Sequence, residues 1–487
     1  MKKKPIAILI LITLLWSSVS LSAGINIADK KESNTFCTTI QKQDTETYHI
    51  SIPLHFSIPK LKTSCLYTNV SLQEASSFLM EPGKPILPAQ TITLSFPLGT
   101  KIRGVDCTFE TSDTLPLSKK VEPAPYPISL DGDQYSPPKL DFQTYHSLQP
   151  YPQQYISYRM GGGLEQDRHV TFLSLQIYPI RYHPVMNKLE YSTQGNIKIT
   201  YEKPLHVPLS VNDDYDLLIL APREFSDKLQ PLVDHKNSTG VKTKLVTLEE
   251  IPINGRDAAE DVKYFIKSSI ENWGIRYVLL VGGAEKFPIR YTHIYVVDNN
   301  EIRDDELFAS DLYFADIYDA NGNFSSWDSN NNDRFGEYNY MNEGITDSVD
   351  LYPDVYVGRL ACIDETEVEI VVNKTINYER ITAYGEPWFT DIVLCGGDSF
   401  TEEAGDTSEI NEGEYANQYV LDLLEGFNGT KLWASNNEIR AASNINNAIE
   451  EGAGFAYFAG HGSPTFWVTH PHNLENRWLP TGGYTTR

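Results

Sequence analysis

The sequence predicts an all-β N-terminal domain followed by a larger unit of two α/β lobes, each built on a parallel sheet. Three observations support this fold class. Residues 25–205 alternate apolar and polar side chains with a period of two, which is typical of half-buried strands. From residue 215 onward apolar runs alternate with helical patterns, and the same alternation resumes after residue 390. The expected segments are 1–23, 24–208, 209–384 and 385–487.

The first segment, residues 1–23, has the composition of a signal peptide. Basic residues from Lys2 to Lys4 precede an apolar stretch from Ile6 to Trp16, and small residues follow in SSVSLSAG. A single membrane anchor is the rival interpretation, but the apolar stretch is short for a bilayer. We expect the chain to be exported and to have no stable membrane span once the leader is removed. It would then act outside the cell or at the cell surface.

The composition is that of a soluble globular protein. Hydrophobic residues make up 41% and charged residues 22% of the 487 positions, which argues against wholesale disorder. The 40 basic and 65 acidic side chains leave a net charge of −25, which argues against nucleic acid and anionic membranes as general partners. The cysteine count is odd and the spacing fits no zinc pattern, although export would allow one disulfide. The cysteines are Cys37, Cys65, Cys107, Cys362 and Cys395.

Strands account for most of the N-terminal domain. In YHISIPLHFSI, residues 48–58, apolar side chains occupy every second position, and residues 92–96 repeat the pattern. KLEYSTQGNIKITY is expected to form a β-hairpin that turns near residues 194–196. The proline- and tyrosine-rich stretch 113–155 is expected to form long loops. No convincing amphipathic helix is visible in this part of the sequence.

The first α/β lobe begins with YDLLILAP, residues 215–222, a continuous apolar run that suits a strand covered on both faces. Further strands are expected at residues 241–248 and 276–283. Helical patterns at residues 224–236 and 257–273 stand between these strands. This order is the signature of a parallel sheet with right-handed crossovers.

A loop-rich insert, residues 284–350, belongs to the first lobe, and a helix is expected at residues 365–380. The strands of the second lobe are DIVLCGG, TKLWAS and the buried run GFAYFAG. Helices are expected at about 412–425 and 443–451. We expect the last lobe to be cut short, because NRWLPTGGYTTR has the character of a loop that leads toward another element.

A histidine between two glycines follows the last predicted strand. His461 stands between Gly460 and Gly462, directly after FAYFA. Reactive groups in open α/β sheets gather at the carboxyl edge of the strands. The glycines would leave room for the imidazole, and the amide of Gly462 could bind an oxyanion. Asp398 follows VLCGG and would lie on the same edge if both strands are parallel, where its carboxylate could orient the imidazole. Simple capping of a turn is the alternative for both residues.

Acidic and amide side chains crowd one part of the insert, SDLYFADIYDANGNFSSWDSNNNDRFGEY. Ca²⁺ takes about six to eight oxygen ligands in flexible geometry. DANGN and DSNNND have the Asp-x-Asn spacing of calcium loops, without the full EF-hand order. A solvated, turn-rich loop is the alternative. The predicted ligands of a structural Ca²⁺ are Asp311, Asp316, Asp319, Asn321, Asp328, Asn330, Asn332 and Glu337. No organic cofactor is expected.

Several of these motifs together resemble the gingipain family of cysteine peptidases, which are relatives of the caspases. The motifs are LLVGG, SDLYFADIYD, SWDSN, DVYVGRL, NYE and GHGSPTFW. PGKPILP and YPIRYHP resemble the β-rich propeptide that precedes the catalytic unit of that family. The resemblance covers most of residues 45–475. It implies a caspase-like fold for the two lobes, calcium binding, and a secreted endopeptidase precursor that cleaves protein or peptide substrates by acyl transfer.

The resemblance also implies roles for residues around the glycine-flanked histidine. His461 would take the proton of a catalytic thiol, and Gly462 would donate its amide to the oxyanion hole. Asp398 lies near the position of the acidic third residue of the family, although Glu402 and Glu403 stay open as alternatives.

Trp467 matches a tryptophan that lines the substrate pocket of the family, whereas Glu414 is a candidate because of its place at the start of a helix. Trp467 would line the pocket for the substrate side chain, and Glu414 would face it. The chain's own propeptide would cover the cleft until it is removed. The polar, proline-bearing stretch 203–214 is the expected place for that processing.

The catalytic cysteine of the family is expected about 30 or more residues after the histidine, at the end of the next core strand. In this chain 487 − 461 = 26 residues follow His461, and none is cysteine. Cys395 is expected to be buried within its strand, and Cys362 belongs to the other lobe. We therefore expect a truncated sequence that lacks its nucleophile and is inactive alone.

The alternative function is that of a non-catalytic, calcium-binding extracellular or surface protein on a peptidase fold. A metal hydrolase that uses His461, His470 and His472 is disfavoured, because no glutamate is placed as in a zincin helix.

Overall fold

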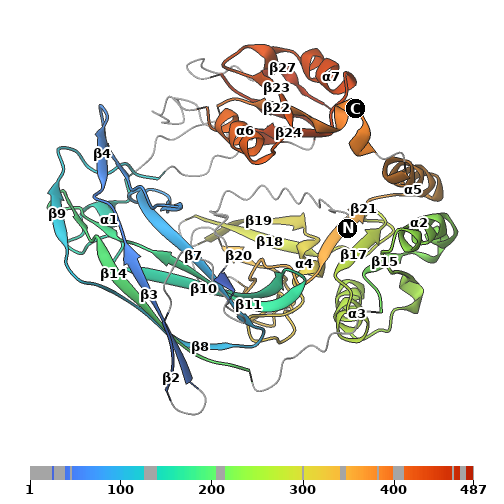
Figure 1. Cartoon of the computed structure of the whole chain (residues 1–487), viewed down its shortest axis with the longest axis horizontal. Helices are drawn as coiled ribbons and strands as arrows, with labels where there is room; N and C mark the ends of the chain where they lie inside the picture. Colours follow the sequence, from blue (N-terminus) through green and yellow to red (C-terminus); the bar gives the residue numbers. More distant parts are fainter. Residues whose placement is uncertain are drawn as a thin grey trace. The chain divides into compact units, whose positions relative to one another are not determined.

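Figure 1 shows the computed structural model of the chain. It describes residues 25–26, 39–43, 47–124, 140–204, 214–298, 301–339, 347–380, 383–398, 411–462, 465–471 and 479–485. The predicted signal peptide lies outside these ranges. The chain forms two compact units. One contains residues 1–80, 85–122 and 143–371, and the other contains residues 81–84, 123–142 and 372–487.

Strands build the N-terminal domain, as the sequence predicts. One sheet has the order β1-β7-β11-β10 with β6 beside β7, and a second has the order β2-β3-β14-β8. The bounds are β1 (Ile25–Asn26), β2 (Thr39–Gln43), β3 (Thr47–His55), β6 (Ser77–Leu79), β7 (Leu87–Pro97), β8 (Lys101–Phe109), β10 (Ile156–Glu165), β11 (Arg168–Ile177) and β14 (Gln194–Glu202). Phe96 of β7 and Tyr201 of β14 pack edge to face with ring centroids 4.9 Å apart, so the two sheets share a core.

The predicted hairpin at residues 188–201 is wrong. β13 (Lys188–Tyr191) pairs with β12 (Ile180–His183) and β9 (Asp113–Pro116), whereas β14 pairs with β3 and β8. The two residues between β13 and β14 carry the chain from one sheet to another. A tight hairpin here needs left-handed backbone, which residues 192–196 do not adopt. The same domain contains β4 (Lys60–Thr63) paired with β5 (Thr68–Ser71), and the short helix α1 (Phe142–Tyr145).

The first α/β lobe contains the predicted parallel sheet. Its order is β16-β15-β17-β21, and all three pairings are parallel. The bounds are β15 (Leu217–Ala221), β16 (Thr243–Thr247), β17 (Tyr277–Val281), β21 (Tyr356–Leu360), α2 (Ser226–Ser238), α3 (Ala258–Trp273) and α5 (Glu365–Arg380). Every residue of β15 is buried, as its continuous apolar run predicts. Val262 and Ile266 of α3 pack in one apolar cluster with Leu218 of β15.

The insert of the first lobe, which lies between β17 and β21, is more regular than the sequence suggests. β18 (Tyr291–Asp298) and β19 (Glu301–Ala309) form an antiparallel ladder, and β20 (Tyr338–Asn339) runs parallel beside β18. A short helix, α4 (Leu312–Ala315), follows. The prediction of a loop-rich segment therefore overlooked a hairpin, because its second strand is strongly acidic and lacks an apolar stripe.

The second lobe is a parallel sheet in the order β23-β22-β24. Its elements are β22 (Asp391–Gly396), α6 (Glu412–Leu423), β23 (Asn428–Trp433), α7 (Ala442–Glu450) and β24 (Phe455–Ala459). Val393 and Cys395 of β22 share an apolar cluster with Ile445 of α7. On the other face of the sheet, Leu394 of β22 lies near Leu421 of α6, because a Cβ on Gly429 would touch both side chains. Because strand side chains alternate, α6 and α7 cover opposite faces of the sheet (Figure 1).

Two expectations for the end of this lobe are corrected. β24 was expected to be buried, but its first four residues are partly exposed, since within the described sheet it pairs on one side only. The stretch 476–487 was expected to be a loop, but it contains β27 (Leu479–Tyr484). β27 pairs with β26 (Trp467–Thr469), which also pairs with β25 (His461–Gly462), and both pairings are antiparallel.

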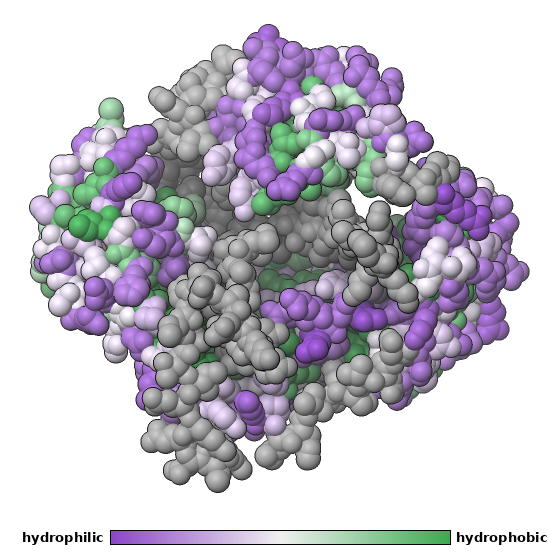
Figure 2. All heavy atoms as spheres, in the orientation of Figure 1, coloured by the Kyte–Doolittle hydropathy of each residue, from purple (hydrophilic) through white to green (hydrophobic). Residues whose placement is uncertain are grey.

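The surface agrees with the acidic composition. The face drawn in Figure 2 is largely hydrophilic, with apolar side chains scattered over it. None of the described helices is long and apolar enough to cross a membrane.

Candidate active site

His461 and Asp398 lie at the carboxyl ends of two neighbouring parallel strands. β22 and β24 are paired with Gly396 opposite Ala459, and each candidate lies two positions beyond that pair. The parallel pairing therefore brings both residues to one edge of the sheet, as the sequence predicts. Asp398 is only 1% exposed, whereas His461 is partly exposed. Glu402 and Glu403, the alternatives to Asp398, lie outside the described residues.

Glycines allow the chain segments at this edge to approach closely. A Cβ on Gly460 would lie 2.8 Å from the ring of Trp467 and 2.6 Å from a backbone carbonyl oxygen of β26. A Cβ on Gly397 would collide with the carbonyl oxygen of His470. Gly462 differs, because no atom lies within 4 Å of the place where its Cβ would be. Gly460 is thus needed for packing, while the space beside Gly462 is open.

His470 contacts both candidates. Its backbone carbonyl accepts from the N–H of Asp398 at 2.8 Å, and its own N–H donates to the Asp398 carbonyl at 3.1 Å. Its imidazole lies against that of His461 with ring centroids 5.7 Å apart. Burial, followed by the charge of His461, lowers the pKa of His470 to about 4, so this ring is neutral at pH 7. The sequence offered only one signal for His470, its spacing of two residues from His472, and that signal suggested a metal hydrolase instead of a contact with His461.

The two predicted pocket residues flank the same edge. Trp467 of β26 pairs with Gly462, and its indole lies edge to face against Phe458 with centroids 5.3 Å apart. Glu414, in the first turn of α6, is 8% exposed. Its carboxylate accepts two hydrogen bonds from Ser435, 2.9 Å from the backbone N–H and 2.6 Å from the hydroxyl. Both side chains are therefore held in fixed positions.

Neither thiol in the two lobes has the character of a nucleophile. Cys395 is fully buried in β22, and burial raises its pKa to about 12. Cys362 is 3% exposed, and burial raises its pKa as well. A thiolate is the reactive form, and both sites disfavour it. The expectation that Cys395 is an ordinary buried strand residue is confirmed.

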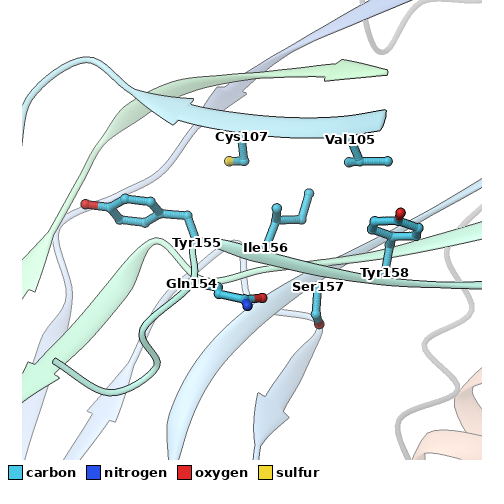
Figure 3. A pocket seen from close by; sticks show the side chains of 7 residues that line it. All are labelled: Val105, Cys107, Gln154, Tyr155, Ile156, Ser157 and Tyr158. Atoms are coloured by element: carbon cyan, nitrogen blue, oxygen red, sulfur yellow. The ribbon is translucent and has the colours of Figure 1, made fainter. Parts of the chain in front are cut away.

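A third thiol lines a pocket of about 470 Å³ in the N-terminal domain (Figure 3). Cys107 and Val105 of β8 face Tyr155, Ile156 and Tyr158 across it. Burial raises the pKa of Cys107 to about 11. The residues that line this pocket include no histidine and no carboxylate, so nothing there would activate the thiol.

Four of the eight predicted calcium ligands, Asp311, Asp316, Asp319 and Asn321, make separate contacts within the protein. Asp311 forms a two-pronged ion pair with Arg359, at 2.6 and 2.7 Å. Asp319 accepts a hydrogen bond from the backbone N–H of Asn321 at 2.8 Å, within its own turn. Asp316 is fully buried elsewhere in the insert. These side chains do not form one site.

The other four predicted ligands converge in a single turn. One oxygen of Glu337 accepts from the side-chain amides of Asn330 at 2.9 Å and Asn332 at 2.8 Å. Asp328 accepts from the backbone N–H of Asn332 at 2.9 Å and also binds Arg256. The amide oxygens of Asn330 and Asn332 accept from the backbone N–H groups of Asn332 at 3.1 Å and Arg334 at 2.9 Å. The set contains the carboxylate and amide oxygens that Ca²⁺ prefers. Among the described residues, however, no group of three or more His, Cys, Asp or Glu side chains surrounds a common metal position.

Lys263 is a buried group that sequence reasoning missed. It lies on α3, is fully buried, and its ammonium is 4.1 Å from the ring centre of Tyr313. Burial lowers its pKa to about 7, and the nearby Asp316 opposes that shift. A lone lysine among the apolar residues of an amphipathic helix was the available signal. The side chain of Lys263 is thus the positively charged group near Asp316, one of the predicted calcium ligands.

Two family models match the chain, and together they span both parts of it. Residues 210–480 match Peptidase family C25, and residues 47–215 match Propeptide_C25. Gingipain R2 of Porphyromonas gingivalis strain W83 is 21% identical over 473 residues, which cover 87% of this chain and 56% of that protein. Gingipain R1 of Porphyromonas gingivalis is 22% identical over 295 residues, covering 58% of this chain and 25% of that protein. The chain thus spans about half the length of the first of these relatives and less of the second.

Solved structures of related proteins match only part of the chain, and their TM-scores are low. The Arg-specific cysteine proteinase gingipain R (RgpB) has a TM-score of 0.37 and 19% identity, covering 54% of this chain and 50% of that one. A structure on the zymogenic latency of gingipain K from Porphyromonas gingivalis has a TM-score of 0.28 and 20% identity, covering 36% of this chain and 96% of that one. On the two family matches, the chain belongs to peptidase family C25, the family of the gingipain cysteine peptidases, and carries the propeptide of that family ahead of its peptidase part.

Proposed function

We propose that the chain is the precursor of a secreted cysteine endopeptidase, with His461 as the general base. The observation that carries this proposal is the shared strand edge of His461 and Asp398 in a chain of peptidase family C25. His461 would take the proton of a cysteine thiol, and the thiolate would attack the peptide carbonyl. The protonated imidazole would then protonate the leaving amine, and water would release the acyl group.

Two groups would support His461 in this reaction. The amide of Gly462, beside which space is open, would stabilise the oxyanion of the tetrahedral intermediate. Asp398, buried at the same edge, would orient the imidazole and stabilise its charged form.

Substrate selection would fall to Trp467 and Glu414. The indole would supply an apolar wall for the substrate side chain. The fixed carboxylate of Glu414 would favour arginine or lysine at the cleaved position, because a desolvated carboxylate binds guanidinium and ammonium groups strongly.

The nucleophile would be a cysteine brought to the edge beside β24. Cys107, Cys362 and Cys395 do not fit this role, because burial keeps their thiols protonated. The 487-residue chain alone is therefore expected to be inactive. The alternative, a non-catalytic surface protein, is not favoured by the peptidase family match.

The N-terminal domain would act as the propeptide that covers the catalytic part until it is removed. Export would follow from the leader, and processing would occur within residues 203–214. The partners would then be protein or peptide substrates and the chain's own propeptide.

The test is a peptidase assay on the protein as its source organism produces it. Peptides that differ at the cleaved position are offered with a thiol reductant, and kcat/KM is measured. His461→Ala should lower kcat/KM by about 10²–10⁴-fold, the usual worth of a general base. His293→Ala, the same change at a partly exposed histidine of β18 within the peptidase part, serves as the control. Unchanged kcat/KM in His461→Ala would refute the proposal.

We also propose that Asp328, Asn330, Asn332 and Glu337 hold a structural Ca²⁺. Calcium added to chelator-treated protein should then raise the melting temperature. At a hundredfold excess over Kd, the gain in stability is about 2.7 kcal/mol. Glu337→Gln should abolish the response, whereas Asp319→Asn, outside the converging turn, should keep it. A melting temperature that calcium does not change, or an equal response in Glu337→Gln, would exclude the site.

A further inference from the structure

The two sheets of the N-terminal domain are open along one side, between β8 and β10. Within the part of the chain that the structure describes, β8 is the last strand of its sheet and pairs only with β14, and β10 is the last strand of the other sheet and pairs only with β11. The two strands face each other across the pocket lined by Val105, Cys107 and Ile156 (Figure 3). We call this opening the seam. An end strand leaves the hydrogen-bonding groups of its outer side without a strand partner.

The core of the domain is uncovered on the β8 side of the seam. Val105 lies opposite Ile199 of β14, and residues that lie opposite each other share one face of a sheet. Cys107 lies opposite Ile197 in the same way. Both isoleucines are 0% exposed, whereas the two β8 side chains are partly exposed, and no residue of β8 is buried. The apolar inner face therefore extends onto β8 without being covered there.

β10 repeats this pattern on the other side of the seam. Ile156 lies opposite Ile177 of β11, and both of these side chains are apolar. Tyr158 lies opposite Leu175. The two β11 residues are 0% exposed, whereas Tyr158 is 45% exposed and Ile156 is partly exposed. Both end strands thus leave the interior open at the same place, as they would if a strand were missing between them.

Tyr155 forms a fixed wall at one end of the seam. Its ring packs edge to face against Phe109 of β8, with centroids 5.0 Å apart. The guanidinium of Arg181 lies 4.1 Å from the centre of the same ring, and the hydroxyl of Tyr155 donates to Glu190 at 3.2 Å. A wall that is already held in place has little freedom to lose when a ligand binds.

The outer edge of β10 already pairs with acceptor groups further along the strand. The N–H groups of Gly162 and Leu164 donate to a carboxylate and a carbonyl of the first lobe, at 2.8 and 2.9 Å. Because backbone groups of a strand alternate in direction, the N–H groups of Tyr158 and Met160 point to the same side as these two. At Tyr158 and Met160, however, no described strand pairs with this edge. The row of donors therefore continues into the seam.

We propose that the seam is a docking site for an extended peptide segment of a second protein. The segment pairs through its main chain with the outer edge of β10, which is the geometry of β-strand addition. Every second side chain of the segment lies over Val105, Cys107 and Ile156 and is apolar, because the side chains of a strand alternate. The site ends where Gly162 meets the first lobe. It lies in the N-terminal domain and needs no peptidase activity.

The test is fluorescence anisotropy with the full 487-residue chain and short labelled peptides. In each peptide threonine alternates with one apolar residue, which is alanine, valine, leucine or phenylalanine, and both ends are blocked. At least one peptide should bind saturably. The same peptide methylated on every backbone nitrogen should have a Kd at least about tenfold higher, because it keeps its side chains but cannot donate to β10. Equal Kd values for the two forms, or no saturable binding of any peptide, would overturn the proposal.

Two variants of β8 locate the bound peptide. Val105→Lys should raise Kd at least about tenfold, because it places an ammonium group among the apolar side chains of the seam. Thr108→Lys adds the same charge at an exposed position on the opposite face of the strand, and its Kd should stay within about twofold. An equal loss of affinity in both variants would contradict binding in the seam.

Alkylation of Cys107 decides the outcome if melting curves show that Val105→Lys does not fold. In the unmodified chain, bound peptide should slow the labelling of Cys107 in proportion to the bound fraction and leave the exposed Cys65 unaffected. Mass spectrometry of the digested protein measures both rates. A Cys107 rate that the peptide does not change would overturn the docking site. None of these readouts uses peptidase activity, so the docking site and the proposed enzymatic function fail or stand separately.

Discussion

At the scale of single residues, the candidate site depends on a side chain with no obvious catalytic role. His470 is neutral at pH 7, lies against the imidazole of His461, and pairs through its backbone with Asp398. It can therefore fix the position of both residues without carrying charge. A protonated His470 would place two like charges side by side.

This arrangement predicts a pH dependence for stability. The pKa of His470 is about 4 in the folded chain and 6.5 as a free group, so the unfolded chain binds more protons between these values. Stability is fully present above pH 6.5 and is lost as the pH falls toward 4. At pH 5 the loss is about 2 kcal/mol.

The measurement is urea unfolding at pH 7.5 and pH 5. His470→Gln should show a smaller difference between the two pH values than the unmodified chain, by about 2 kcal/mol. Histidines that do not contact His470 contribute equally to both proteins and cancel in the comparison. An unchanged difference would mean that His470 is not the group responsible.

At the scale of elements, the turn from β24 into β25 depends on one glycine more than on the other. Gly460 lies under Trp467 and against the backbone of β26, while Gly462 faces open space. The symmetry of Gly-His-Gly in the sequence hides this difference. Packing of β26 over the turn creates it.

Gly460→Ala should destabilise the C-terminal lobe by about 1–3 kcal/mol, the usual cost of forcing a methyl group into a packed site. Gly462→Ala should change stability by no more than about 0.5 kcal/mol. Thermal unfolding, monitored by the fluorescence of nearby tryptophans, measures both. If the two variants melted together, the close approach of Trp467 to Gly460 would be contradicted.

At the scale of the whole molecule, the described thiols fall into distinct environments. Cys65 is exposed, whereas Cys362 and Cys395 are buried with raised pKa values. A catalytic cysteine would show the opposite combination, a lowered pKa with access to solvent.

Native protein treated with iodoacetamide at pH 7 should therefore be labelled first at Cys65. Cys362 and Cys395 should react only after denaturation, and mass spectrometry of the digested protein locates each label. Rapid labelling of native Cys395 would reopen it as a nucleophile.

Local patterns in the sequence were sufficient to predict most elements of the two lobes and the β-rich character of the N-terminal domain. The period-two strands, the apolar run at residues 217–221 and the amphipathic face of α3 depend on neighbouring residues in the chain. They could be recognised because burial of one face imposes a fixed spacing. The same rule placed His461 and Asp398 at one edge once parallel strands were assumed.

The sequence failed where long-range pairing decides the outcome. β13 and β14 look like one hairpin, yet their partners lie far away in the chain, and the strand at residues 479–484 has no local pattern that reveals it. The sequence also gave no sign that Arg359 would pair with Asp311 or that Lys263 would lie near Asp316, because both cations come from distant elements.

By itself, the sequence determined the β-rich class of the N-terminal domain, the α/β class of the two lobes, the acidic character and the candidate histidine, since these follow from composition and short-range spacing. Only the tertiary structure decided that His470 contacts His461 and Asp398, and that β10 lies against the insert. It also decided that Gly460 is closely packed whereas Gly462 faces open space. Each of these depends on contacts between residues that are distant in the chain or on opposite sides of a turn. Such contacts are fixed by packing and by the pairing of buried polar groups, which leave no periodic trace in the sequence.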